Sequence, residues 1–242
     1  MKEIKIISWI SFLLFSGMAI AQPKLGVKAG VNWSRIESNE PWSEMSMQRG
    51  AQAGVVASWP LSDRLSFRNE LLYIKKGGNA YVVWTNQVNT TILDGEVLIH
   101  YLEVPIYVDY AIPIRKKRTV VFGLGLFGAV GIGGDYRYQY HSYATNDPSN
   151  RTSSDVFKGE LKFGEYQEMP DPNGAFDTKS RWDCGVKSAI GFRYPNFTLE
   201  MAYGMGFLNI GTIDPFDQTK DWSYTRSVQI GVTFYPRILS KV

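Results

Sequence analysis

Segments of about ten residues in which apolar and polar side chains alternate recur along this chain and constrain its fold most. Successive side chains of a β-strand point to opposite faces, so this pattern predicts strands with one apolar and one polar face. The clearest segment is 101–110, where Leu102, Val104, Ile106, Val108 and Tyr110 alternate with Tyr101, Glu103, Tyr107 and Asp109. Similar segments cover 25–33, 50–59, 65–75, 120–130, 181–194, 197–207 and 228–234. The sequence therefore predicts eight strands and an all-β fold.

The connections between these segments alternate between short and long. The short ones lie near 60–64, 111–118 and 194–196, and the long, polar ones lie near 36–48, 76–96, 131–180 and 209–223. Outer-membrane barrels have short periplasmic turns and longer extracellular loops, whereas a soluble sandwich has no reason to sort its loops by end. We therefore predict an eight-stranded antiparallel up-and-down transmembrane β-barrel with long extracellular loops.

The N-terminal segment predicts export. Lys2 and Lys5 precede an almost uncharged apolar stretch over 6–20, and Ala19-Ile20-Ala21 has the small-x-small pattern of a signal-peptidase site. An uncleaved anchor is the alternative, but the stretch is short for a spanning helix. We expect residues 1–21 to be a cleavable signal peptide and residues 22–242 to form the barrel domain in a bacterial outer membrane.

The polar strand faces carry charges that an eight-stranded barrel must enclose. Such a barrel is only wide enough inside for side chains, so these groups should pair with one another in the lumen, whereas in a soluble sandwich they would be solvated. They are Lys28, Arg68, Glu70, Glu103, Asp109, Asp183, Lys187, Arg193 and Glu200. Aromatic residues toward strand ends predict interfacial girdles and are Trp33, Trp59, Tyr73, Tyr110, Trp182 and Tyr194.

Little in the sequence indicates a catalytic or metal site. The net charge of +3 is too small to indicate nucleic-acid binding. Cys184 is the only cysteine, which excludes a disulfide framework, and we interpret it as a packing residue. No His/Cys cluster has metal-ligand spacing. We therefore predict no catalytic, cofactor-binding or metal-binding residues, and no cofactor.

The two histidines, His100 and His141, are the only candidates for a lipid-acting enzyme. His100 is expected near the barrel mouth at the start of a strand, and His141 in the third long loop beside Ser142. Adjacent residues on an extended segment point in opposite directions, which argues against a His141–Ser142 pair. We keep a lipid-acting enzyme as an alternative function.

The third long loop, 131–180, and one short turn are the most informative appendages. Gly131-Ile-Gly-Gly134 predicts a strand-to-loop hinge and not a phosphate-binding loop, since no helix pattern follows it. Tyr136, Tyr138 and Tyr140 alternate, so this face could extend the barrel strands and bind a ligand or partner. The carboxylates of the loop match no calcium pattern and should be solvated; they are Asp147, Asp155 and Asp171. The turn Arg115-Lys-Lys-Arg118 could contact anionic headgroups or an acidic periplasmic partner, or simply stay polar.

Several segments resemble the PorT-like outer-membrane β-barrel family over nearly the whole mature chain. They are Leu25-Gly-Val-Lys-Ala-Gly-Val-Asn32, Asn69-Glu-Leu-Leu-Tyr73, Lys75-Lys-Gly77, Tyr101-Leu-Glu-Val-Pro-Ile106 and Ile230-Gly-Val-Thr-Phe-Tyr235. The resemblance implies an eight-stranded barrel and, for one member type, a part in protein secretion. Barrels of this kind often end on an aromatic residue that the assembly machinery reads, whereas here Pro236 to Val242 follow Tyr235.

The prediction for function is a non-enzymatic outer-membrane barrel with a structural, binding or secretion-associated role. A lipid-acting enzyme and a small pore are the alternatives. A lumen filled by paired charges should block conduction. The expected partners are outer-membrane lipids, the barrel-assembly machinery and an envelope or secretion protein, but not nucleic acid.

Overall fold

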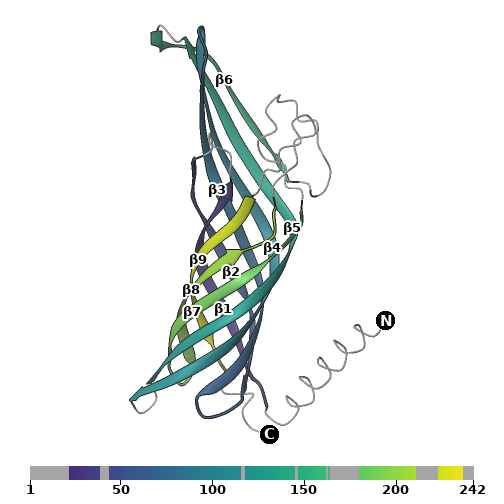
Figure 1. The fold of residues 1–242 in the computed structure, drawn as a ribbon, viewed down its shortest axis with the longest axis vertical. Helices are drawn as coiled ribbons and strands as arrows, with labels where there is room; N and C mark the ends of the chain where they lie inside the picture. The colour runs from purple at the N-terminus through teal and green to yellow at the C-terminus, as the bar shows by residue number, and fades with distance from the viewer. Residues whose placement is uncertain are drawn as a thin grey trace, which may run out of the picture.

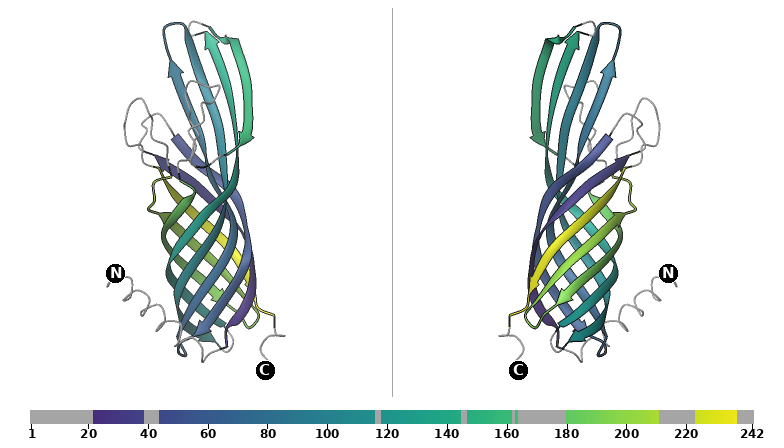
Figure 2. Two further views of the ribbon diagram at one scale, coloured as in Figure 1. Left: turned by 90° about the vertical axis from the view of Figure 1, so that its right-hand side faces the viewer. Right: turned by 90° about the vertical axis from the view of Figure 1, so that its left-hand side faces the viewer.

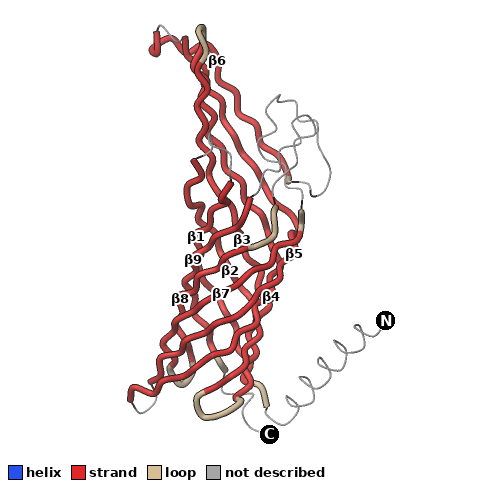
Figure 3. The backbone as a smooth tube through the Cα atoms, in the orientation of Figure 1, coloured by secondary structure: helices blue, strands red, loops and turns tan. Residues whose placement is uncertain are grey.

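The described part of the chain folds almost entirely into β-strands (Figure 3). The computed structural model describes residues 22–38, 44–115, 118–144, 147–161, 163, 180–210 and 223–236. The strands are β1 (Lys24–Ser38), β2 (Glu44–Pro60), β3 (Leu65–Thr85), β4 (Asn89–Arg115), β5 (Arg118–Ala144), β6 (Asp147–Glu160), β7 (Trp182–Arg193), β8 (Phe197–Gly206) and β9 (Ser223–Phe234). In the described part of the chain, no helix is long and apolar enough to cross a membrane.

Eight of the nine strands close into a ring (Figure 1). The order around the ring is β1, β2, β3, β4, β5, β7, β8 and β9, and β9 pairs with β1 to close it. In this closing register, Val31 lies opposite Ile230 on one side and Ala51 on the other. All these pairs are antiparallel, which confirms the predicted eight-stranded up-and-down barrel. The ninth strand, β6, lies outside the ring and pairs only with β5 among the described strands.

The short turns gather at one end of the barrel, which we call the turn end. At 61–64, the Leu61 and Ser62 amides donate to the Leu65 carbonyl, and at 194–196 the Tyr194 amide donates to the Phe197 carbonyl. Of the basic turn, residues 116 and 117 lie outside the described residues, and Arg115 and Arg118 are exposed strand ends. The described chain also starts and finishes here, since Gln22 and Pro236 line one cavity.

At the opposite end, which we call the hairpin end, the prediction of a loop over 76–96 is wrong. β3 continues to Thr85 and β4 begins at Asn89, so these residues form a long β-hairpin. The Asn86 side-chain oxygen closes its turn by accepting bonds from the amides of Val88 (2.8 Å) and Asn89 (2.7 Å). An Asn that bonds the backbone two and three residues on can build such a turn without an Asn-Gly pair.

The prediction of a loop over 131–180 is also wrong for its first half. β5 runs through Gly131–Gly134, which is therefore not a strand-to-loop hinge, and β6 follows it. β5 exchanges partners here: Val130 is its last residue paired with β7, and Asp135 is its first paired with β6. The β4–β5 register shifts between His100 and Tyr101, which marks a bulge at the exchange.

The other two predicted long loops are only partly described. β1 reaches Ser38 and β2 begins at Glu44, so both strands enter the predicted loop 36–48. Most of the predicted loop 209–223 lies outside the described residues.

β3, β4, β5 and β6 therefore extend beyond the ring as a sheet (Figure 2), and β2 pairs with the base of this sheet through residues 44–47. We call this part the projecting sheet and define it as residues 78–85 of β3, 89–98 of β4, 135–144 of β5 and 147–160 of β6. The pairs Gly78–Val97, Val97–Tyr136 and Tyr136–Gly159 run across its base. The molecule thus has a closed ring at the turn end and an open sheet at the hairpin end.

Candidate functional site

The outer wall of the ring carries a continuous apolar band. On β4, the outward side chains from Leu102 to Ile112 are 38–51% exposed, and this segment is eleven residues long. A tilted strand crosses the hydrocarbon core of a bilayer in about 9–11 residues. The band is therefore matched to lipid. The aromatic residues predicted to form girdles are all at least partly exposed and are Trp33, Trp59, Tyr73, Tyr110, Trp182 and Tyr194.

The inner wall of the ring carries the charges that the alternation placed in a lumen. Of the nine predicted residues, eight are at most 6% exposed, and Arg193 is half-buried near the turn end. Lys76, which is 2% exposed, is a further lumen charge. Lys76 could not be predicted from the alternation, because residue 76 falls in the segment 76–96 that was predicted to be a loop.

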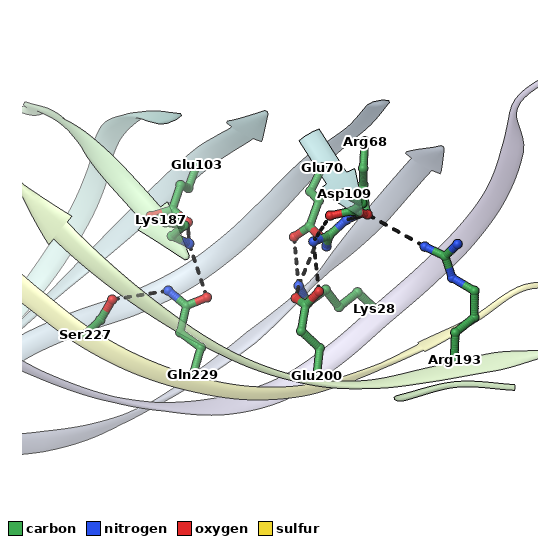
Figure 4. A network of polar contacts seen from close by, with 10 residues as sticks. All are labelled: Lys28, Arg68, Glu70, Glu103, Asp109, Lys187, Arg193, Glu200, Ser227 and Gln229. Carbon is green, nitrogen blue, oxygen red and sulfur yellow. Dashed lines mark hydrogen bonds and ion pairs between the residues drawn. The ribbon is translucent and has the colours of Figure 1, made fainter. Parts of the chain in front are cut away.

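Six of these residues form one cluster nearer the turn end (Figure 4). The Lys28 ammonium donates to Glu70 Oε2 at 2.9 Å and to Glu200 Oε1 at 2.7 Å. The Arg68 guanidinium contacts Glu70, lies 2.8 Å from Glu200 Oε2, and donates from Nε to Asp109 Oδ2 at 2.8 Å. Arg193 reaches the cluster only at 3.7 Å, from Nη2 to Asp109 Oδ2. We call these residues the turn-side cluster: Lys28, Arg68, Glu70, Asp109, Arg193 and Glu200.

The other four form a second cluster nearer the hairpin end. Glu103 accepts from Lys187 and, at 2.6 Å, from the Lys76 ammonium. Lys76 also lies 3.5 Å from Asp183 Oδ2, which accepts a 2.7 Å bond from the Thr225 hydroxyl. We call Lys76, Glu103, Asp183 and Lys187 the hairpin-side cluster. Gln229 continues it by accepting from Lys187 at 3.1 Å (Figure 4).

Each cluster contains equal numbers of positive and negative side chains. The turn-side cluster has three of each and the hairpin-side cluster has two of each. A buried charge is tolerated only where a partner and hydrogen bonds compensate its lost hydration. Apart from Arg193, which is half-buried and approaches Asp109 only at 3.7 Å, the members of the two clusters meet this condition and fill the lumen with nearly inaccessible side chains.

Beyond the ring, the outward face of β4 changes from apolar to polar and its inward face changes from polar to apolar. From Leu102 toward the turn end, the even-numbered residues that face outward are apolar, and the odd-numbered inward ones include Glu103 and Asp109. From Leu98 toward the hairpin end, the exposed even-numbered residues are the polar Asp94 and Glu96, while the odd-numbered Val97 is buried. A strand whose outer face changes from apolar to polar has passed from lipid into water. The reversal therefore marks one boundary of the membrane.

The inner face of the projecting sheet is the apolar one. Leu93, Val97 and Ile99 are at most 3% exposed and belong to a core that includes Ile36, Leu161 and Ile210. The tyrosines predicted to form a binding face lie here. The Tyr136 and Tyr138 rings stack at 5.2 Å, and Phe157 packs against Tyr138 at 5.7 Å. Tyr138 is 3% exposed, so this face is a core and not an open binding surface.

The outer face of the projecting sheet is accessible and mixed in character. Cross-strand pairs join Asn79 with Glu96, Glu96 with Arg137, and Arg137 with Lys158, so charges of both signs form a row. The next rows hold exposed apolar side chains: Tyr81 (48%), Val83 (46%) and Val156 (47%). Exposed apolar residues beside paired charges are a composition that suits protein recognition.

The two histidines are both placed in strands. His100 lies within β4 and does not begin it; its Nε2 is 3.3 Å from Asp135 Oδ2. His141 lies in β5 and not in a loop, with its Nδ1 3.4 Å from Ser154 Oγ, while Ser142 contacts Thr91. From the end of the β5–β7 pairing to His141 is eleven residues, or roughly 35 Å along the strand. His141 therefore lies far from the apolar band.

The remaining candidates do not converge on a metal site. Asp147 and Asp155 lie eight residues apart on β6, roughly 26 Å along an extended strand, and Asp171 lies outside the described residues. Among the residues that the structure describes, no group of three His, Cys, Asp or Glu side chains could hold a metal ion. Cys184 is a half-buried free thiol on the outer wall.

Comparison with known proteins gives one family and a set of similar folds. A family model described as an outer membrane protein beta-barrel domain matches residues 20–211. Among solved structures, Ail of Yersinia pestis is 10% identical, covers 88% of this chain and 98% of its own, and has a TM-score of 0.35. Neisserial surface protein A is 12% identical, with coverages of 88% and 97% and a TM-score of 0.39. A search of curated protein sequences finds no match.

Proposed function

The chain belongs to the outer membrane protein beta-barrel domain family, and on that premise we propose that it is a non-enzymatic, non-conducting barrel that presents the projecting sheet to a binding partner. The observation that carries the proposal is the reversal of alternation at His100 on β4. On this proposal an ordered sheet, whose apolar inner face continues the core formed by Ile74, Tyr101 and Phe127 of the ring, stands in water beyond the apolar band. An ordered extension of this length exceeds what a connection between two strands needs, and it suits the binding of a partner.

The orientation follows from the loop lengths. Short turns face the periplasm in bacterial outer-membrane barrels, so the projecting sheet faces the outside of the cell. Residues 1–21 then act as a cleavable signal peptide, and the barrel-assembly machinery inserts the mature chain among outer-membrane lipids. A secretion-associated role of the PorT-like kind is one form of this binding role, in which the partner is a secretion component.

Cross-linking followed by co-purification tests the binding role. The variant Tyr81→Ser/Val83→Ser/Val156→Ser removes the exposed apolar side chains of the outer face, and Leu124→Ser, in the lipid-facing band, is the matched control. We expect the outer-face variant to lose its cross-linked partner about tenfold, which corresponds to about 1.4 kcal/mol of binding energy. Both variants should keep heat-modifiable gel mobility. Equal recovery of the same partners from wild type and the outer-face variant would refute the binding role.

The pore alternative is opposed by the lumen. The charges of both clusters are paired with one another at side-chain exposures of 7% or less, apart from Arg193, so side chains occupy the lumen where a pore would need water. Planar-bilayer recordings should therefore show no steady conductance. The enzyme alternative is opposed by the distance between His141 and the apolar band, and a lipid-hydrolysis assay should show no activity that His141→Ala abolishes.

A further inference from the structure

The lumen ends at the turn end in a cavity of about 620 Å³. It lies where the start of β1, the end of β2, the start of β3 and the end of β7 converge with the turn at 194–196. The polar side chains that line it include those of Lys24, Ser58, Ser66, Arg193 and Tyr235. Among the described residues that line the cavity, none is a carboxylate. Its walls therefore offer donors and positive charge.

Arg193 provides a positive charge that is only partly compensated. Its side chain is 29% exposed, and its ion-pair contact is the 3.7 Å approach to Asp109. Asp109 already accepts two bonds from Arg68, at 2.8 Å from Nε and 3.1 Å from Nη2. Figure 4 shows Arg193 at the outer end of the network, apart from the other members. Lys24 adds an exposed positive charge to the same cavity.

Ser66 provides an unused hydrogen-bond donor in the same wall. It is 6% exposed, and its hydroxyl has no hydrogen-bond partner among the described residues. A buried hydroxyl without a partner is costly, so a ligand that accepts its hydrogen bond gains affinity. Tyr235 follows β9 at the turn end, and burial raises the pKa of its phenol. The phenol therefore stays protonated and can donate as well.

We propose that this cavity binds a phosphate-class anion. A guanidinium matches two phosphate oxygens with parallel hydrogen bonds, and the Ser66 hydroxyl and Lys24 ammonium can serve the remaining oxygens. In the proposed orientation the cavity opens to the periplasm. The anion then comes either from a phospholipid headgroup of the inner leaflet or from free phosphate.

Two binding measurements on the full mature barrel test the site. The first is titration of inorganic phosphate, followed by ³¹P NMR, in a zwitterionic detergent. The second is native mass spectrometry of lipid retained from nanodiscs of phosphatidylglycerol or phosphatidylcholine. We expect Arg193→Gln to weaken binding about tenfold and Ser66→Ala severalfold, because each removes a donor to the anion. Arg64→Gln, which changes an exposed cation of the turn at 61–64 that does not line the cavity, should have no effect.

The two arms distinguish the source of the anion. Phosphate binding that depends on Arg193 supports a free anion, and retention of phosphatidylglycerol alone that depends on Arg193 supports a headgroup. Equal binding by wild type and both cavity variants, or no binding in either arm, overturns the proposal. Heat-modifiable mobility shows whether each variant is folded. If Arg193→Gln does not fold, Ser66→Ala decides, because it removes one oxygen without creating an unpaired charge.

Discussion

The charged lumen and the projecting sheet share three strands, β3, β4 and β5, yet their inner faces have opposite chemistry. On β4, Glu103 and Asp109 face the lumen, whereas Leu93 and Val97 face the core of the sheet. The difference follows from what lies outside the wall. Lipid requires an apolar outer face, so polar side chains go inward and must pair; water permits a polar outer face, so apolar ones go inward.

The two interiors are therefore stabilised by different interactions. The lumen depends on the mutual compensation of buried charges. Removal of one partner therefore leaves the other charge buried without compensation. The core of the sheet depends on apolar burial and aromatic packing, where a truncation leaves a cavity. Substitutions at matched positions should reveal this contrast.

Glu103→Gln should have the largest effect. Glu103 is fully buried and compensates two ammonium groups, those of Lys76 and Lys187, so the variant leaves uncompensated buried charge. We expect the free energy of unfolding to fall by about 3–5 kcal/mol. Urea unfolding in lipid vesicles measures it. Glu96→Gln, exposed on the same strand, is the control and should change stability by no more than about 0.5 kcal/mol; comparable losses in both would break the contrast.

Leu93→Ala should have a large but local effect. Leu93 is 1% exposed in the core of the projecting sheet, and its truncation should cost about 2–4 kcal/mol there. Amide hydrogen exchange should accelerate over 89–98 and stay slow over 102–112. If both segments lost protection together, the ring and the sheet would be one cooperative unit and not two.

Gly123→Ala should have an intermediate effect. A Cβ at Gly123 would lie 2.7 Å from Asp109 Oδ1 and 3.2 Å from Arg68 Nη2, so the turn-side cluster has to shift. We expect a loss of about 1–3 kcal/mol in urea unfolding. At Gly128, on the same strand, a Cβ would meet nothing within 4 Å, and Gly128→Ala should be near neutral. An equal loss in the two variants would show that strand propensity, rather than lumen space, decides.

Glu37→Gln should have the smallest effect, although Glu37 also forms ion pairs. Its side chain is 30% exposed at the hairpin end and contacts Arg226 Nε at 3.1 Å as well as Arg35. Exposed pairs contribute about 0–1 kcal/mol and are screened by salt. Unfolding at two salt concentrations measures the change. A salt-insensitive loss as large as that of Glu103→Gln would mean that burial does not distinguish the two ion pairs.

The ring could be predicted from the sequence because lipid imposes a regular pattern on it. Outward residues such as Val104 and Ile106 must be apolar, and Lys28 and Glu103 fall on the opposite face by strand geometry alone. The pairing partners could not be predicted, because they depend on the register across the ring. Glu200, on β8, contacts Lys28 although the two residues are 172 positions apart along the chain.

The projecting sheet could not be predicted because its pattern is of another kind. Its outer face carries Asp94 and Glu96 where the ring carries apolar residues, so the alternation reads as a polar loop. β6 has few apolar residues and depends on pairing with β5. β4 is 27 residues long, well beyond the usual length of about 3–10. Lys76 could not be predicted because residue 76 also falls in the segment that reads as a polar loop.

The central claim is that the reversal at His100 marks the membrane boundary, and spin labelling tests it most directly. In a Cys184→Ser background, Glu96→Cys and Val104→Cys place labels on the outer face of β4 on either side of His100. Power-saturation measurements in vesicles compare access to oxygen, which partitions into lipid, with access to a water-soluble nickel complex. We predict that the label at position 104 is relaxed mainly by oxygen and that at position 96 mainly by the nickel complex. The same preference at both positions would contradict the account.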